Sequence, residues 1–249
     1  LLAGAVLPAQ AAQEQDLAAG GFYLTASISS KTLIEPVRVA YQPGQSILQA
    51  LLASSYAFDG LAEGYLYAVE GQSGNYTYYY DGGGYDLSVS ASSITALYIS
   101  EVSGAYQEGT AELIAALGQF AAQEGGVRRY APAQQAYEAA LKALRSGADN
   151  PAGLQKDLQD AIGAYNALQS GTKYTVTAQA TQAGSTLTDP SVELTDAYGN
   201  KTSGQGSVQV VAGEYRFCIS DGGYNRTEGT VQVDGDQSIS VTLPSGQWF

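Results

Sequence analysis

The chain has 249 residues, a length that suits two domains or three small ones. Its 24 acidic residues outnumber its 11 Lys and Arg residues, and the resulting net charge of −13 disfavours binding to nucleic acid or to anionic lipid. The sequence has no His and one Cys, Cys218, which excludes His-based catalytic triads, His-containing metal sites and intrachain disulfides. We therefore expect no catalytic residues, no metal and no cofactor in this chain.

Residues 1–20 predict the remnant of a secretory signal peptide and a linker. The run LLAGAVLPAQAA has Ala9 and Ala11 where a signal peptidase accepts small residues, so we expect cleavage after Ala11. A short buried helix is the alternative, because the run is too short to cross a bilayer, which needs about 20 apolar residues. A secretion signal without paired cysteines indicates a secreted or cell-surface protein of a bacterium rather than of an animal.

Residues 21–104 predict a small α+β domain. Alternation of apolar and polar residues at 22–28 and 37–41 predicts two half-buried strands. Ser46 is a predicted N-cap, and Ile47, Leu48, Leu51 and Leu52 then form one apolar face of a helix. Such a helix is expected to cover one face of a sheet. Further strands are expected at residues 65–69, 76–80 and 94–100.

Residues 108–171 predict a helical segment rich in Ala, Gln, Leu and Glu. Apolar residues recur at helical spacing in three stretches, each followed by a glycine: Gly125, Gly147 and Gly171. Pro132 and Pro151 lie near the starts of the second and third stretches, a position that proline tolerates. We expect either a three-helix bundle or an antiparallel hairpin with a connecting helix.

Residues 172–249 predict a β-sandwich, because short alternating stretches are separated by Gly-containing turns. Tyr215, Phe217 and Ile219 share one strand face, so Cys218 is expected on the other face. We expect Cys218 to be passive, since no His is present to activate it. The expected strands are 174–179, 191–195, 207–211, 214–220, 227–233 and 237–243.

Three resemblances follow from these segments. The first domain resembles the C-terminal, β-grasp-like domain of transcobalamin and its relatives in secreted bacterial proteins. The residues that carry this resemblance are Tyr41–Leu52, Gly64–Gly71 and Tyr76–Tyr80. This resemblance implies a β-grasp-like fold for residues 21–104 and a small corrinoid-like ligand, although the tryptophan of the family is missing here and Asp81-Gly82 replaces its Asn-Gly turn.

The other two resemblances concern the helices and the last segment. Tyr137–Leu144 and Leu158–Leu168 resemble FIVAR repeats, which space modules in Gram-positive surface proteins. Val192–Gly199 and Ala212–Phe217 are similar to the carboxypeptidase-regulatory, PEGA and Cna-B group, which implies a prealbumin-like sandwich for residues 172–249.

Tyrosine is the least ordinary feature of the composition, with 19 residues. Strand alternation places Tyr76, Tyr78 and Tyr80 on one face and Tyr79 on the other. Tyrosine rings on a solvated sheet can stack on sugars or pack against a protein, so these four residues and Tyr85 are the candidate ligand-binding residues. The alternative is that the rings fill the core of a small domain while their hydroxyl groups reach water.

The carboxylates offer weaker candidates. Glycoside hydrolysis needs two acids held across a cleft, and no spacing among the acids of residues 59–101 selects such a pair. The runs Asp81–Asp86 and Asp234–Asp236 supply fewer oxygen ligands than Ca²⁺ requires. We expect both runs to be ordinary turns.

These observations predict a modular, non-catalytic extracellular segment of a surface protein, which spaces and displays modules for adhesion or for contact with a glycan or a protein. One alternative is that the segment consists of accessory domains of a larger secreted enzyme. Another is that the first domain binds a small ligand. No membrane span is expected in residues 1–249, and the sequence leaves the oligomeric state open.

Overall fold

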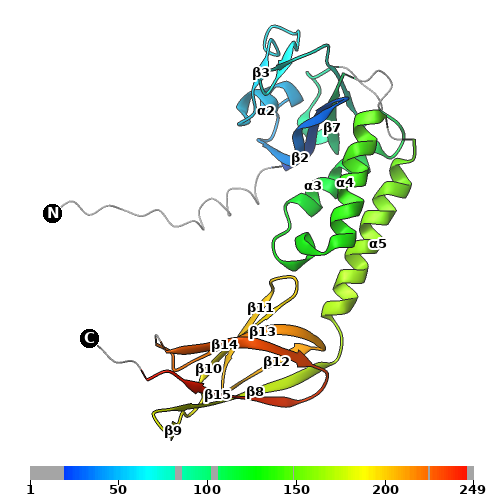
Figure 1. Ribbon diagram of the computed structural model, residues 1–249. Helices are drawn as coiled ribbons and strands as arrows, with labels where there is room; N and C mark the ends of the chain where they lie inside the picture. Colours follow the sequence, from blue (N-terminus) through cyan, green and yellow to red (C-terminus); the bar gives the residue numbers. More distant parts are fainter. Residues whose placement is uncertain (1–19, 82–85, 102–105, 148, 224, 246–249) are drawn as a thin grey trace, which may run out of the picture. The chain divides into compact units, whose positions relative to one another are not determined.

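A computed structural model describes residues 20–81, 86–101, 106–147, 149–223 and 225–245. This part of the chain is mixed α+β, with four helices and several β-sheets (Figure 1). It divides into two compact units. Unit 1 comprises Leu1–Gln123 with Gln135–Gln159, and unit 2 comprises Glu124–Gln134 with Asp160–Phe249.

The main sheet of unit 1 has the order β2-β1-β7-β6. Strands β1 and β7 run parallel in its centre, and both outer pairs are antiparallel. A second, three-stranded sheet is formed by the short strands β3, β4 and β5. The strands of the main sheet are β1 (Gly20–Ile28), β2 (Lys31–Tyr41), β6 (Thr77–Tyr80) and β7 (Ala96–Ser100), and those of the small sheet are β3 (Phe58–Asp59), β4 (Ala68–Val69) and β5 (Gln72–Ser73).

Both faces of the main sheet are covered. Phe22, Leu24 and Ala26 of β1 enter a core that they share with helix α2 (Ile47–Ala53). The alternate residues face helix α3 (Thr110–Ala121) and the end of helix α4 (Ala131–Ser146). The prediction of a half-buried strand at 22–28 is therefore wrong for Thr25 and Ser27, which are buried because β1 is a central strand.

Buried hydrogen bonds compensate for these polar residues. The Thr25 hydroxyl donates to the carbonyl oxygen of Ile34 at 2.8 Å. The hydroxyl groups of Ser27 and Tyr98 lie 2.8 Å apart, and Tyr98 donates to the carbonyl oxygen of Leu144 in α4 at 2.7 Å. The sheet of unit 1 is thus hydrogen-bonded to helix α4.

The predicted N-cap of α2 is confirmed. The Ser46 side chain accepts a hydrogen bond from the Gln49 N–H, and the Gln49 side chain accepts one from the Ser46 N–H, which is a capping box. Ile47 and Leu51 are buried as expected, whereas Leu52 is exposed.

Helix α5 (Pro151–Gln169) begins in unit 1 and ends in unit 2, and α4 also has residues in both units. The three predicted helices are present at about the expected positions. Gly125 and Gly147, which follow α3 and α4, adopt φ values of 85° and 79°, in the left-handed region that glycine accepts without strain. A short 3-10 helix, η2 (Gly126–Arg129), belongs to unit 2.

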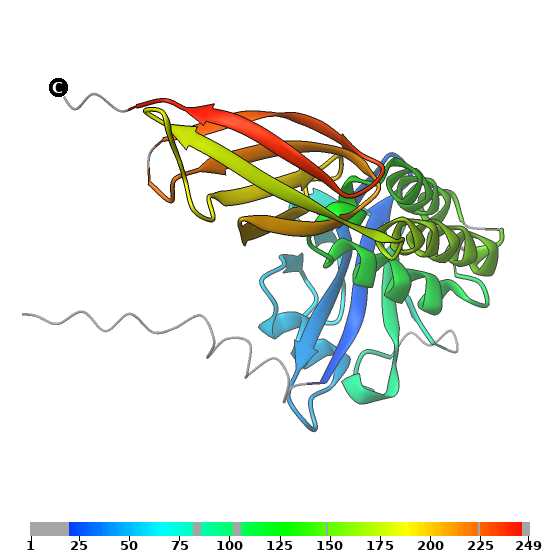
Figure 2. The same cartoon turned by 90° about the horizontal axis from the view of Figure 1, so that it is seen from below.

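Unit 2 contains two sheets that enclose one hydrophobic core, with strand orders β11-β10-β13-β14 and β12-β8-β15. Strands β8 and β15 run parallel and side by side (Figure 2). Gly206 alone separates β11 from β12, so the chain changes sheets at one residue. The strands are β8 (Lys173–Gln182), β9 (Ser185–Thr186), β10 (Ser191–Asp196), β11 (Lys201–Gln205), β12 (Ser207–Val211), β13 (Gly213–Ser220), β14 (Arg226–Val233) and β15 (Gln237–Leu243).

Candidate functional site

The tyrosines selected from the sequence lie mainly in the packing of unit 1. Tyr76 and Tyr79 are each only 8% exposed. Tyr78 and Tyr80 are half-buried, and their rings pack against the core on the side of α2. Tyr79 lies on the opposite face, where it stacks on Tyr106 with the ring centres 6.1 Å apart. The predicted alternation is therefore present, and it directs these rings inward; Tyr85 lies outside the described residues.

Two other tyrosines in the described part of the chain are exposed. Tyr65 is 66% exposed and Tyr67 is 52% exposed, while Leu66 between them is buried. The Tyr65 N–H donates to the carbonyl oxygen of Gly60 at 2.9 Å, and the Tyr67 N–H donates to that of Asp59 at 3.0 Å. We call these two side chains the Tyr65–Tyr67 surface, because both project from a backbone that is fixed by hydrogen bonds.

The surroundings of this surface favour contact with polar, uncharged or cationic groups. The Tyr67 ring lies directly over Gly60, where a Cβ atom would meet its carbon atoms at 2.5 Å. Asp59 and Glu63, which belong to the same segment, are exposed. Sequence reasoning missed this surface because it assigned residues 65–69 to a strand without choosing which face is solvated.

The aspartates of the turns act as acceptors for backbone N–H groups. Asp81 accepts from the N–H groups of Thr95 and Ala96 at 2.6 and 3.2 Å. Hydrogen bonds from Ser88 hold the pKa of the Asp86 carboxyl below its usual value, and hydrogen bonds from Asn225 and Gly223 do the same for Asp221. A general acid in glycoside hydrolysis needs a raised pKa, which is the opposite shift.

Cys218 lies on β13, directly between Glu193 and Glu228 of the neighbouring strands. Its thiol is free and half-buried. The two glutamates pair instead with cations, Glu193 with Lys201 at 2.8 Å and Glu228 with Arg226 at 3.2 Å. Within the described ranges, no group of three or more Cys, Asp or Glu side chains is placed to hold a metal ion.

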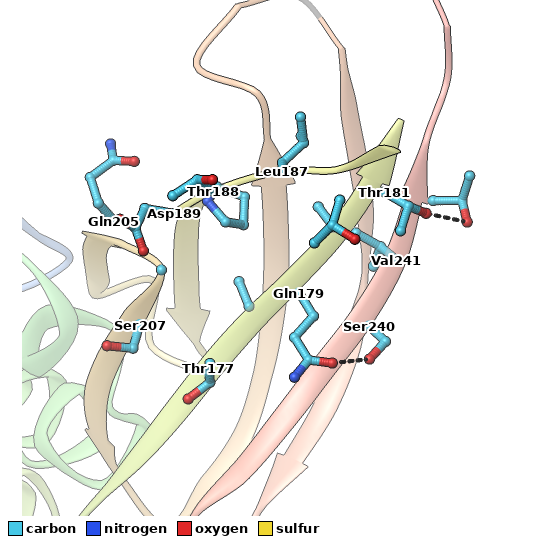
Figure 3. Close-up of a pocket in the computed structure, with 16 residues that line it drawn as sticks. Thr177, Gln179, Thr181, Leu187, Thr188, Asp189, Gln205, Ser207, Ser240 and Val241 are labelled. Carbon is cyan, nitrogen blue, oxygen red and sulfur yellow. Dashed lines mark hydrogen bonds between the residues drawn. The ribbon is translucent and has the colours of Figure 1, made fainter. Parts of the chain in front are cut away.

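Unit 2 has a groove of about 860 Å³ at one corner of its two sheets. Its wall consists mainly of hydroxyl and amide side chains from β8, β15 and the segments before β10 and β12 (Figure 3). Sequence reasoning missed this groove, because polar residues are expected on the outer face of a strand whether that face is flat or concave.

Asn200 joins the helical part of unit 2 to its sheets. Its side-chain oxygen accepts a hydrogen bond from the Gly126 N–H at 3.0 Å. Its amide nitrogen donates to the Tyr165 hydroxyl of α5 at 2.7 Å and to the Asp196 carboxylate at 2.6 Å. The rings of Tyr130, Tyr165 and Tyr198 pack around this point with centres 5.5 to 5.8 Å apart. We call this group of residues the Asn200 cluster.

Comparison with known proteins adds no relative: the sequence matches no family model and no curated protein. The resemblances noted above therefore depend on the residues quoted for them. None of the described helices has both the length and the apolar composition that crossing a bilayer requires.

Proposed function

We propose that this chain is a non-catalytic extracellular segment of a bacterial surface protein, which spaces and displays binding modules. The observation that carries the proposal is that helical residues are hydrogen-bonded into both β-rich units. In unit 1, Tyr98 bonds to Leu144, and Arg145 donates to the Thr32 hydroxyl at 3.2 Å. In unit 2, the Asn200 cluster holds α5 and η2 against the sheets.

The module types named from the sequence are part of this proposal. A β-grasp-like assignment for unit 1 is supported by the strand order β2-β1-β7-β6, by its parallel central pair and by a helix that follows the first hairpin. A prealbumin-like assignment for unit 2 is supported by two sheets around one core. Helices that connect two such modules suit the spacing role of FIVAR-like segments.

The side chains of this chain suit binding to a partner rather than catalytic turnover of a substrate. Carboxylates such as Asp81 and Asp196 accept hydrogen bonds from backbone N–H groups, Asp81 from the start of β7 and Asp196 from its own turn. The Tyr65–Tyr67 surface instead presents two tyrosine side chains that are 66% and 52% exposed. Tyrosine contributes large contact areas at little entropic cost, which is why it is enriched in binding surfaces.

The experiment that tests the proposal is co-sedimentation of the purified chain with insoluble polysaccharides and with Gram-positive cell walls. We expect binding that the double replacement Tyr65→Ala/Tyr67→Ala weakens at least fivefold. The double replacement with Phe keeps the rings and should retain most of the binding, and Leu52→Ala is a control at another exposed apolar side chain of unit 1.

A parallel assay follows the release of soluble sugars or peptides from the same materials. Release by the purified chain that is abolished when one carboxylate is replaced would show an enzyme and refute the proposal. Binding that is unaffected by the Ala double replacement would refute the role of the Tyr65–Tyr67 surface.

A further inference from the structure

The groove of unit 2 lies where the chain crosses from one sheet to the other. The Gly206 N–H donates to the carbonyl oxygen of Pro190 at 2.9 Å, and its own carbonyl oxygen accepts from the Ala178 N–H at 2.8 Å. Gly206 thus ties the start of β10 to β8, in opposite sheets. These backbone bonds make the floor of the groove a fixed part of the fold.

Side chains on this floor and its walls are oriented before any ligand arrives. The Ser240 hydroxyl donates to the side-chain oxygen of Gln179 at 3.0 Å, and the amide nitrogen of Gln179 points away from Ser240 (Figure 3). Thr181 and Thr242 are paired in the same way, with their hydroxyl oxygens 3.3 Å apart. Orientation of this kind reduces the entropy that binding costs.

Among the described residues that line the groove, Asp189 is the only ionisable one. It adopts a φ of 47°, a left-handed conformation that costs a non-glycine residue free energy and that is often found at functional sites. Its carboxylate is exposed and accepts no hydrogen bond from any residue in the described ranges. The groove therefore offers an acceptor at Asp189 in addition to the amide donors of Gln179.

The chemistry of the lining selects one class of ligand. No Lys or Arg is found in the lining as far as the structure describes it, so phosphates and other anions would meet the negative charge of Asp189 there. Hydroxyl groups such as those of Thr177 and Ser207 both donate and accept, and amides such as that of Gln205 offer both functions too. A volume of about 860 Å³ is within the range that holds a ligand of several rings.

We propose that this groove binds a neutral oligosaccharide, whose hydroxyl groups pair with Asp189, Gln179 and the surrounding Thr and Ser side chains. The inference deepens the proposed contact function by adding a second surface and a ligand class. The carboxylate accepts from adjacent hydroxyl groups of the sugar, and the Gln179 amide donates to a ring or hydroxyl oxygen.

The test uses the full chain and a panel of neutral tetrasaccharides built from glucose, mannose, galactose, xylose or N-acetylglucosamine. Amide chemical shifts are followed by NMR during titration. We expect at least one tetrasaccharide to shift the amides of residues 177–181 and 186–189. Asp189→Asn and Gln179→Ala should each weaken that binding about tenfold, since a hydrogen bond to a charged group and a paired amide are lost.

The controls separate the groove from the rest of the molecule. Gln232→Ala removes an exposed amide from the other sheet and should leave the affinity unchanged. Asparagine tolerates the left-handed conformation at position 189, so Asp189→Asn should keep the melting temperature. An anionic tetrasaccharide of hyaluronan should bind at least tenfold more weakly than the best neutral one.

Two results would overturn the inference. One is the absence of binding by every neutral tetrasaccharide of the panel. The other is binding that shifts residues of the Tyr65–Tyr67 surface and leaves the groove unchanged, in which case the proposed function stands without the groove. Loss of polysaccharide co-sedimentation in the Tyr65→Ala/Tyr67→Ala variant, with groove binding retained, would show that the two sites act separately.

Discussion

Replacement of Gly60 by alanine tests whether the segment that carries Tyr65 and Tyr67 is packed as tightly as the structure shows. Gly44 is a matched control in the same unit, because its φ of 85° is nearly the same as the 82° of Gly60. Alanine in the left-handed region costs about 1–2 kcal/mol at either position. A Cβ atom at Gly44 meets no atom within 4 Å, so Gly44→Ala should cost this strain alone.

At Gly60 a second cost is added. The new Cβ atom would overlap the carbonyl oxygen of Tyr65 and would lie 2.5 Å from the Tyr67 ring, whereas ordinary contacts begin near 3.4 Å. Relief requires a backbone movement that breaks the Tyr65–Gly60 and Tyr67–Asp59 hydrogen bonds, each worth about 1 kcal/mol. Gly60→Ala should therefore cost about 3–4 kcal/mol in total.

The difference between the variants is the informative quantity. Chemical denaturation with urea, followed by circular dichroism, should give a free energy of unfolding about 2 kcal/mol lower for Gly60→Ala than for Gly44→Ala. For a unit of this size, the melting temperature should differ by about 4–8 °C. Equal losses of stability in the two variants would refute the close packing of Tyr65 and Tyr67 over Gly60.

Three further predictions follow from hydrogen bonds and burial. Asn200→Ala leaves the Gly126 N–H and the Tyr165 hydroxyl without their partner, so it should lower the free energy of unfolding by about 2–3 kcal/mol. Amide hydrogen exchange at residues 126–130 should also become faster. The control Asn166→Ala, at an exposed position of α5, should change neither the stability nor the exchange rates. Tyr98→Phe removes a buried hydroxyl between Ser27 and Leu144 and should lower the free energy of unfolding by about 1–3 kcal/mol. The control is Tyr67→Phe, which removes a hydroxyl from an exposed ring. Equal losses of stability in the two variants would contradict the buried hydrogen bond. Burial, together with the nearby carboxylates Asp81 and Glu112, raises the pKa of Tyr106 to about 12, so the stability that its neutral form contributes is complete below pH about 10 and is lost as the pH rises through about 12. Absorbance at 295 nm should show part of the tyrosine ionising only as circular dichroism reports unfolding, and ionisation of all tyrosines near pH 10 in a folded protein would contradict this.

Much of the secondary structure could be predicted from local signals. Strands β12 and β15 occur at the predicted residues, because clear alternation lies between turns at both sites. Strand β11, with the sequence KTSGQ, was not predicted. It carries no apolar residue, so its sequence shows no alternation of apolar and polar side chains. Its position is fixed by backbone pairing with β10, which does not depend on such a pattern.

The candidate site could be predicted only in part, because tertiary packing decides which face of a strand meets solvent. Tyr78 and Tyr65 belong to similar alternating stretches, yet Tyr78 pairs with Ile99 of the central strand β7 and lies against the core. The segment with Tyr65 instead lies beside the small sheet, where Leu66 is buried and Tyr65 and Tyr67 are exposed. Local alternation predicts that two faces exist, and the long-range partners determine which one is available for contact.

The division of both units into separate stretches of chain affects how unit 2 is completed during synthesis. Residues 124–134 are the first part of unit 2 to leave the ribosome. The sheets of unit 2 are made only after residues 135–159, which belong to unit 1. Until Asn200 is synthesised, the Gly126 N–H has no side-chain oxygen to accept it. A fragment that begins at residue 172 would likewise lack Gly126, Tyr130 and Tyr165, so the cluster around Asn200 can form only in a chain that retains the helices.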